Sequence, residues 1–338
     1  MMLPESVFAD KIVLITGGTG SFGKEFARRL LLEDACHKVI IFSRDEWKQW
    51  EIQQSDPIFR RDKIRFFLGD VRDTSRLKLA FDQVDYIVHT AVLKQIYATE
   101  YNPSETIKTN INGSMNVIDI AIEQGVKKVI YLSSDKAVNA TSLYGTTKAC
   151  AEKLFITANG YTGAKRDPRL SIVRFGSILD GCSGVLTLWK NLLSQGAKEL
   201  PLTDVRMSRF WITLTQAVDF VIRALTEMAG GEIFVPKLPS IKVADIGAVV
   251  APHTPLSITG IRPGEKLQEI LISNDEAQHT VDCTDYYIVV PQFMAQDQAQ
   301  IKKFLAGRGR NFVPEKFSYG SEATEAGVRQ HIEWLKSL

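Results

Sequence analysis

Five side chains of the kinds that move protons lie within one short segment. Residues 129–148 read VIYLSSDKAVNATSLYGTTK and place Ser134, Asp135, Lys136, Tyr144 and Lys148 just past an apolar run and along the stretch that follows. Tyr144 and Lys148 are one helical turn apart, so the ammonium, together with a positive nicotinamide, should lower the pKa of the phenol. The phenolate could then take the proton of a substrate alcohol while hydride leaves its carbon, with Ser134 bonded to the same oxygen.

The adjacent Asp135 and Lys136 exceed what such an oxidation requires. Once an alcohol is oxidised to a ketone, the proton on the neighbouring carbon becomes acidic. Lys136 could remove that proton while Asp135 protonates a hydroxyl leaving the next carbon. Water would be eliminated, and the hydride would return to the resulting enone. The plainer interpretation is a charged loop pair without a catalytic role.

A glycine-rich turn precedes these residues in the chain. TGGTGSFG, residues 16–23, follows the apolar run KIVLIT and opens the helical stretch KEFARRLLLE. Gly17 permits a tight turn, Gly20 lets the backbone approach a pyrophosphate, and Gly23 allows close packing of the helix on the strand. The GxxGxxG spacing is typical of short-chain dehydrogenases and reductases, and the turn predicts a dinucleotide site.

The end of the second apolar run indicates which dinucleotide binds. An acidic residue there would bond the ribose of NAD, whereas this chain has Ser43 and Arg44, with Lys48 nearby, which favour the 2′-phosphate of NADP. Arg44 could instead be a surface charge paired with Asp45 or Glu46. The cofactor-binding residues expected in full are Gly17, Thr19, Gly20, Ser21, Phe22, Gly23, Ser43, Arg44, Asp70, Val71, Ala91, Tyr144 and Lys148.

Short apolar runs alternate with helix-length segments through the first half of the chain. These runs lie at 11–16, 38–42, 64–68, 85–90, 127–133 and 170–175. The pattern predicts an α/β fold with a doubly wound parallel Rossmann sheet over residues 1–176. Residues 177–338 read mainly as a smaller substrate-binding lobe of loops and short helices, with a strand at 232–236 returning to the sheet and a final helix at 322–337.

Composition excludes several classes of partner. The 338 residues carry 41 basic and 39 acidic side chains without a basic run, so neither nucleic acid nor an anionic membrane is favoured. No apolar run approaches the length of a membrane span, and a cytoplasmic location is expected. The four cysteines form no CxxC, and the five histidines form no metal-binding spacing, so no metal site is predicted.

The motifs resemble a known family in order and over nearly the whole chain. They are TGGTGSFG, FSRDEWKQ, GDVRD, LKQ, EYNPSETIKTNINGSMNVID, SSDKAVN, LYGTTK, DVRMSRFWIT, GGEIFVPK and GIRPGEKLQE. The chain is similar to the inverting UDP-N-acetylglucosamine 4,6-dehydratases, extended short-chain dehydrogenases of bacterial pseudaminic acid synthesis that are soluble and often oligomeric. The resemblance implies oxidation at C4, elimination across C5 and C6, hydride return to C6, and inversion at C5. Retaining and membrane-bound relatives often have Met at the position of Tyr144.

The resemblance also implies roles for individual residues. Ser134, Asp135, Lys136, Tyr144 and Lys148 match the catalytic set, and Asn110 matches a supporting helix residue. A UDP-sugar would be bound by Lys94, Ser177, Arg206, Arg209, Arg262 and Glu265, with the arginines on the diphosphate. The loop at 176–187 departs from the family: Ser177 replaces Asn, Cys182 replaces Arg, and Asp180 adds a negative charge, so weaker diphosphate binding is expected. Gln95 and Tyr97 stand where relatives have His and Pro.

Two other readings remain open from the sequence. A UDP-sugar 4-epimerase or a simple NADP-dependent reductase would use Ser134, Tyr144 and Lys148 and leave Asp135 and Lys136 idle. A non-catalytic NADP-binding protein would need none of the five, and nothing physical would then keep them together.

Overall fold

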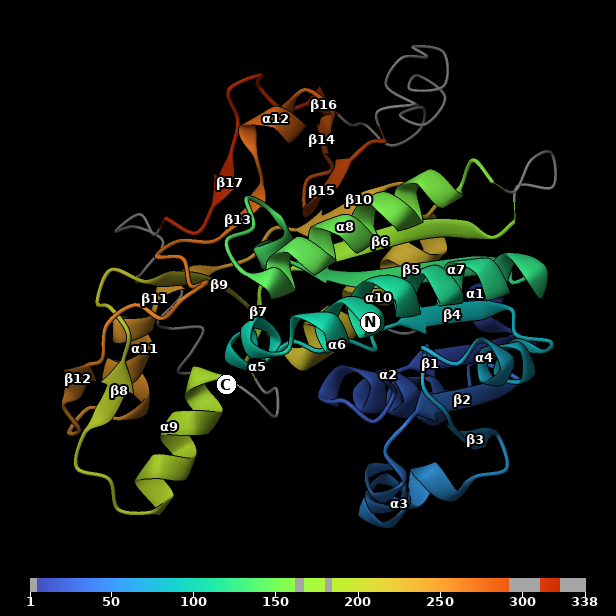
Figure 1. The fold of residues 1–338 in the computed structure, drawn as a ribbon, viewed down its shortest axis with the longest axis horizontal. Helices are drawn as coiled ribbons and strands as arrows, with labels where there is room; N and C mark the ends of the chain where they lie inside the picture. The colour runs from blue at the N-terminus through green and yellow to red at the C-terminus, as the bar shows by residue number, and fades with distance from the viewer. Residues whose placement is uncertain (1–4, 162–166, 180–183, 292–310, 323–338) are drawn as a thin grey trace.

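A ten-stranded sheet forms the centre of the computed structural model, which describes residues 5–161, 167–179, 184–291 and 311–322 (Figure 1). Seven strands are parallel, in the order β3-β2-β1-β4-β5-β6-β10. Their bounds are β1 Ile12–Thr16, β2 Lys38–Ser43, β3 Ile64–Leu68, β4 Tyr86–His89, β5 Lys128–Ser134, β6 Arg169–Phe175 and β10 Ile233–Pro236. The predicted doubly wound parallel sheet is confirmed, with strands at all six predicted apolar runs.

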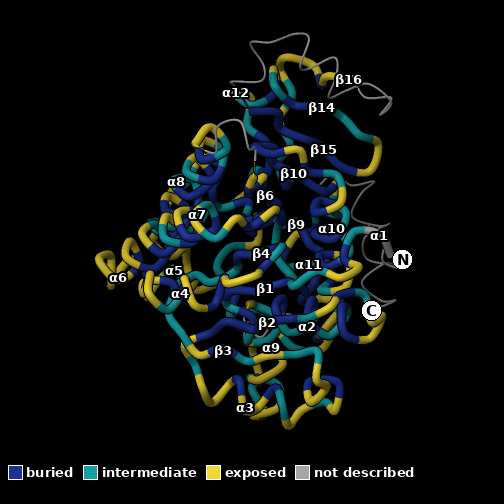
Figure 2. The backbone as a smooth tube through the Cα atoms, turned by 90° about the vertical axis from the view of Figure 1, so that its right-hand side faces the viewer, coloured by how far each residue is buried: buried dark blue, intermediate teal, exposed yellow. Residues whose placement is uncertain are grey.

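Residues alternate between the two faces of the sheet. On β1, Val13 and Ile15 belong to one hydrophobic core and Leu14 to the other, and Ile41 and Ile40 of β2 divide in the same way. Both faces are therefore buried, which explains why these strands read as continuous apolar runs rather than alternating ones. Figure 2 shows the buried strands running through the middle of the molecule, with exposed loops at its periphery.

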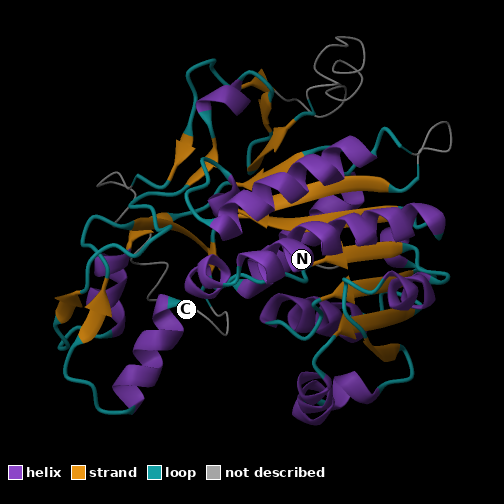
Figure 3. Ribbon diagram, in the orientation of Figure 1, coloured by secondary structure: helices purple, strands orange, loops and turns teal. Residues whose placement is uncertain are grey.

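Helices cover both faces (Figure 3). One face is packed by α2 and α10, which contact each other, and the opposite face by α4, α7 and α8. The helices are α1 Glu5–Phe8, α2 Ser21–Leu32, α3 Glu46–Ser55, α4 Thr74–Phe81, α5 Ile96–Tyr101, α6 Pro103–Ile107, α7 Gly113–Glu123, α8 Leu143–Ala158, α9 Val185–Ser194, α10 Leu214–Glu227, α11 Val243–Val250 and α12 Asn274–Ala277. Single turns are η1 Pro57–Arg60, η2 Lys108–Asn112, a π turn, and η3 Asp135–Ala137.

The second half of the chain contributes to both the sheet and a smaller lobe. Beyond β10 the sheet continues with the antiparallel strands β15 Tyr286–Val289, β14 Thr280–Asp282 and β16 Asn311–Phe312. The lobe contains the small sheets β11-β9-β7, β12-β8 and β13-β17. Their strands are β7 Ser177–Ile178, β8 Leu200–Leu202, β9 Ser208–Ile212, β11 Ser240–Lys242, β12 Leu256–Ile258, β13 Ile270–Ile272 and β17 Tyr319–Gly320.

The lobe has a hydrophobic core of its own around the fully buried Trp189. By contrast, α10 packs on β5 and β6 and lies on the main sheet. A domain boundary at residue 176 stays a prediction. The helix predicted at 322–337 lies, apart from its first residue, outside the described residues. Within the described ranges, every helix is too short or too polar to cross a bilayer.

Candidate active site

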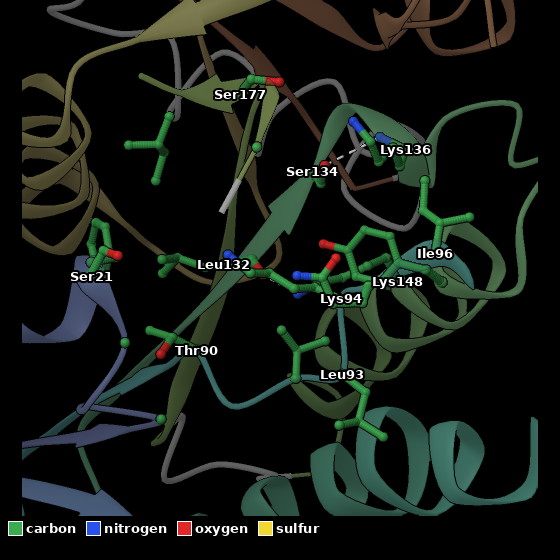
Figure 4. A pocket seen from close by; sticks show the side chains of 18 of the residues that line it. Ser21, Thr90, Leu93, Lys94, Ile96, Leu132, Ser134, Lys136, Lys148 and Ser177 are labelled. Atoms are coloured by element: carbon green, nitrogen blue, oxygen red, sulfur yellow. Dashed lines mark hydrogen bonds between the residues drawn. The ribbon is translucent and has the colours of Figure 1, made fainter. Parts of the chain in front are cut away.

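A cleft of about 1500 Å³ opens at the carboxyl ends of the parallel strands, where they face the lobe. It is lined by the glycine turn after β1, the end of β2, the segment after β4, the end of β5 and the first turn of α8. The lobe closes it with residues such as Leu202 and Met207. In Figure 4, Ser21 and Thr90 lie on one side of this cleft, and Lys94, Lys136 and Lys148 gather on the other. Ligands of doubly wound sheets bind at this edge.

The glycine turn is shaped for close approach of a phosphate. Gly17 has a φ of +64°, and a Cβ atom there would lie 2.8 Å from Ala91 Cα. A Cβ atom on Gly23 would lie 2.5 Å from Gly18 Cα, so helix α2 can pack on the turn only without a side chain there. Helix α2 begins at Ser21, and its first residues line the cleft, so the N-terminus of the helix lies where it favours an anion. The turn therefore fits a dinucleotide pyrophosphate.

The far end of the cleft holds the residues predicted to select the cofactor. Ser43 Oγ lies 2.9 Å from Thr19 Oγ1. Arg44 is about half exposed, and its Nη1 lies 3.5 Å from Asp70 Oδ2. Asp45 caps helix α3 and pairs with Lys48, so the alternative pairing of Arg44 with Asp45 is not the one observed. Arg44 and Lys48 both line the cleft.

A buried chain of hydrogen bonds joins β1 to helix α7. Ser114 donates to Asn110 O at 2.7 Å, so its oxygen accepts from His89 Nε2 at 3.2 Å. His89 Nδ1 then accepts from Thr16 Oγ1 at 2.6 Å, and the tautomer is fixed. Burial, helped by the charge of Lys148, lowers the pKa of His89 to about 3, so the ring stays neutral.

The side chain of Asn110 holds the segment after β4 by hydrogen bonds to both backbone groups of Leu93. Its Oδ1 accepts from Leu93 N at 2.8 Å, and its Nδ2 donates to Leu93 O at 3.0 Å and to Thr147 Oγ1 at 3.0 Å. Asn110 lies in the π turn η2, a geometry that is rare in general and frequent at functional sites. The segment carrying Lys94 is thereby fixed against helix α8.

Tyr144 and Lys148 are buried on the first turns of α8. Lys148 Nζ donates to Leu132 O at 2.5 Å and lies 4.3 Å from the centre of the Tyr131 ring. Burial lowers the pKa of Lys148 to about 7, and the nearby charge of Lys94 acts in the same direction. Burial raises the pKa of Tyr144 to about 12, and Lys136 is the cation that opposes this. Without a bound nicotinamide the pKa of Tyr144 is therefore raised, and its lowering by an ammonium together with that cation stays a prediction.

Asp135, Lys136 and Ser134 form one bonded group. Asp135 Oδ1 accepts from Ser134 Oγ at 2.6 Å and from Lys136 Nζ at 3.1 Å, while Oδ2 is buried without a partner among the described residues. Asp135 is completely buried behind the cleft wall, which Ser134 and Lys136 line. A side chain on Gly145 would collide with the carbonyl of Lys136, so α8 packs directly on η3. The pair, a buried Asp135 and a Lys136 whose side chain is 23% exposed, thus lies against the site and is not a solvated loop pair.

Comparisons with known proteins agree with this geometry. The family model described as "Polysaccharide biosynthesis protein" matches residues 13–291. A protein of Campylobacter jejuni named UDP-N-acetylglucosamine 4,6-dehydratase (inverting) is 46% identical over 94% of both chains. The chain belongs to the polysaccharide biosynthesis protein family, and this dehydratase is one of its relatives. A UDP-glucose 4-epimerase of Rickettsia massiliae is 35% identical over 98% of this chain and 96% of its own. The X-ray structure of Pen from Bacillus thuringiensis superposes with a TM-score of 0.86 at 33% identity, covering 98% and 99% of the chains.

The resemblance to inverting 4,6-dehydratases is therefore confirmed, and the cleft brings most of the predicted residues together. It is lined by all the predicted cofactor residues, by four of the five predicted catalytic residues, and by Lys94, Ser177, Arg209, Arg262 and Glu265. Their individual roles stay predictions, as do NADP as cofactor, the pseudaminic acid pathway, a homo-oligomer and a cytoplasmic location. Asp180 and Cys182 lie outside the described residues.

The three arginines expected at the diphosphate differ in their surroundings. Arg206 does not line the cleft; its side chain is 68% exposed, and its guanidinium donates two hydrogen bonds to the carboxylate of Asp204. Arg209 lines the cleft but donates to the carbonyls of Ser208, Leu267 and Lys266. Arg262 is 69% exposed and pairs with Glu265 at 2.7 Å. Of the three, Arg262 is the most available to an anion in the cleft.

Glu269 lines the cleft beside Lys136, although the sequence analysis did not predict it. It is the last residue of the family motif GIRPGEKLQE, which was the signal that could have found it. Gly264 of the same motif has a φ of +79°, and a Cβ atom there would lie 2.8 Å from Ser142 Cβ. Thr141 also donates to Gly264 O at 3.1 Å. The motif therefore lies against the start of α8, next to the predicted catalytic residues.

Proposed function

We propose that this chain is a nucleotide-sugar 4,6-dehydratase that acts on UDP-N-acetylglucosamine with NADP, as a step in bacterial 6-deoxy sugar synthesis. The observation that carries the proposal is the bonded pair of the buried Asp135 and the partly exposed Lys136 next to Tyr144. An alcohol oxidation alone needs no second acid and base. The 46% identical relative bears the name of this activity and supports the same substrate.

The glycine turn, the start of α2 and Arg44 would hold the dinucleotide, with the phosphates on the backbone N–H groups and the 2′-phosphate on Arg44. When bound, this cofactor supplies the acceptor for the hydride of C4 and the donor of the hydride to C6. Tyr144 takes the proton of the 4-hydroxyl, and Lys136, the cation that acts on the phenol, favours its ionised form. The charge of a bound nicotinamide would favour the same ionised form.

Elimination then depends on Lys136 and Asp135. Asp135 and Glu269 raise the pKa of Lys136 above its usual range, against the effect of burial, so the side chain begins as an ammonium. Before Lys136 can act as the base, Nζ must lose a proton to solvent, and Asp135, whose Oδ1 lies 3.1 Å away, must hold a proton to act as the acid. The amine takes the proton of C5, and the acid, through Ser134 Oγ at 2.6 Å, protonates the hydroxyl that leaves C6.

The test is to incubate the purified protein with UDP-N-acetylglucosamine in deuterated water and follow the sugar by proton NMR. A 4-keto-6-deoxy product with deuterium at C5, formed without net consumption of NADP, is expected. Its ring couplings report whether C5 is inverted. An intact sugar together with retained NADP binding would contradict the proposed substrate.

A 4-epimerase is the second candidate, because relatives with that name are also similar over nearly the whole chain. Epimerisation changes only the configuration at C4 and retains the 6-hydroxyl. The same NMR experiment would then show UDP-N-acetylgalactosamine and no loss of water. Asp135→Asn would leave such an epimerase unaffected.

Arg44 is predicted to distinguish NADP from NAD. Arg44→Gln should weaken NADP binding about 10- to 100-fold, because bonds to a charged phosphate contribute roughly 1.5–3 kcal/mol, and should leave NAD binding nearly unchanged. Titration of each dinucleotide by fluorescence or calorimetry measures this. Arg72→Gln is the matched control, since Arg72 also pairs with Asp70 but does not line the cleft. Equal weakening of both dinucleotides by Arg44→Gln would contradict the assignment.

A further inference from the structure

Glu269 is a buried carboxylate on which three cations converge. It is 2% exposed. Its Oε1 lies 3.4 Å from Lys136 Nζ and 3.8 Å from Arg209 Nε, and its Oε2 lies 3.0 Å from Lys266 Nζ. Its backbone is fixed to Ser321, with N–H donating to Oγ and C=O accepting from N, both at 2.8 Å. The carboxylate is therefore held at a set place beside Lys136.

Lys136 consequently lies between two carboxylates from different parts of the fold. Asp135, on its own turn η3, lies on one side, and Glu269, from the segment before β13, lies on the other. Tyr144 faces it from α8, and Arg209 and Lys266 lie behind Glu269 on the lobe side. Ionised Glu269 favours the ammonium form of Lys136, while the two lobe cations weaken that effect.

We infer that Glu269 is a positioning residue that holds Lys136 and sets the pH at which its amine becomes able to take the C5 proton. This inference rests on the proposed function. In that step the C5 proton moves to Nζ, and the electron pair of the C–H bond stays on the sugar as the enolate of the C4 ketone. Lys136 must therefore be neutral for this step, whereas it must be charged to assist Tyr144 in the preceding oxidation. Glu269 keeps it charged until then.

A purely structural role for Glu269, as an anchor of the lobe, predicts a different result. Loss of the anchor would lower stability or affinity without moving the pH dependence of C5 proton removal. The pH profile therefore separates the two explanations.

The experiment measures the rate of dehydration of UDP-N-acetylglucosamine against pH, with hydrogen or deuterium at C5. The part of the pH–rate profile in which the rate depends on the isotope at C5 is the limb that reports C5 proton removal. Glu269→Gln should move the midpoint of the rising limb to lower pH by about 1–3 units, since a neighbouring opposite charge shifts a pKa by that amount. Glu269→Asp, which retains the charge, should restore the limb toward the wild-type position.

Lys266→Met gives a test of opposite sign that does not require Glu269 to be changed. It removes a cation 3.0 Å from Glu269 Oε2, so the limb should move to higher pH. Glu265→Gln is the matched control: it makes the same chemical change in the same motif, but Glu265 pairs with Arg262, and the limb should stay in place whatever happens to KM.

The inference would be overturned if the midpoint of the limb in folded Glu269→Gln lay at the same pH as in wild type. It would also be overturned if the midpoint in Lys266→Met did not move to higher pH. Thermal unfolding and NADP binding establish that each variant is folded. If the wild-type protein forms no 4-keto-6-deoxy sugar at all, the proposed function has failed. If it forms that sugar and only the limb does not move, the role of Glu269 alone is rejected.

Discussion

Lys136→Met should lower the rate of water elimination by about 10²- to 10⁴-fold, the contribution typical of a positioned acid or base. Oxidation at C4 should still occur, so that reduced cofactor accumulates on the enzyme because no enone forms to accept the hydride. Single-turnover absorbance of the reduced nicotinamide measures this. Oxidation should also be slower than in wild type, since loss of the cation further raises the pKa of Tyr144.

Tyr144→Phe is the control for this experiment. It removes the group that accepts the 4-hydroxyl proton, so neither reduced cofactor nor dehydrated sugar should appear. The two variants thus stop the reaction at different steps. Normal turnover in Lys136→Met would indicate that Asp135 and Lys136 are idle, as in an epimerase or a reductase.

Arg174→Met should reduce the free energy of unfolding by about 3–5 kcal/mol, because it leaves the buried Glu152 and the partly buried Glu276 without their shared cation. Arg174, on β6, is 2% exposed and is bonded to both oxygens of Glu152 on α8, at 3.0 and 2.6 Å. It also pairs with Glu276 on α12 at 3.0 Å and donates to Leu271 O at 2.7 Å. One guanidinium therefore joins the sheet, helix α8 and the edge of the lobe.

Arg223→Met provides the comparison. Arg223 also has two carboxylate neighbours, Glu227 at 4.0 Å and Asp285 at 3.7 Å, but it is one-third exposed. Its loss should cost no more than about 1 kcal/mol. Urea denaturation of both variants measures the difference, with an unchanged slope showing that the same surface is exposed. If both variants lost a similar free energy of unfolding, the importance of burial at Arg174 would be contradicted.

The parallel strands and the dinucleotide turn were predictable because their causes are local. A strand buried on both faces must be apolar throughout, and the turn around Gly17 needs glycine for steric reasons that the sequence displays. The grouping of Ser134, Tyr144 and Lys148 followed from one strand and the helix after it. In these cases neighbours in sequence are also neighbours in space.

The features that sequence reasoning did not find depend on contacts between distant segments. Glu269 meets Lys136 only because the lobe packs on η3, and the guanidinium of Arg209 is directed to backbone carbonyls of its own lobe. Helix α10 follows the boundary proposed at residue 176 and yet packs on the main sheet. The pKa of Tyr144 is raised because the phenol is buried. The spacing of Tyr144 and Lys148 along the helix does not determine how far either side chain is buried.

The π turn at Lys108–Asn112 sets the direction in which the side chains before it face relative to those of α7. Each residue of an α-helix turns the next side chain by about 100°, so removal of one residue here would rotate everything before it relative to α7 by that angle. Asn110 would then no longer face Leu93, while the apolar side of α7 would still face the sheet. The wide turn thus lets one continuous helical segment direct Asn110 toward Leu93 and the apolar side of α7 toward the sheet. Deletion of a single residue within it should break the contact of Asn110 with the segment after β4 without unfolding the core.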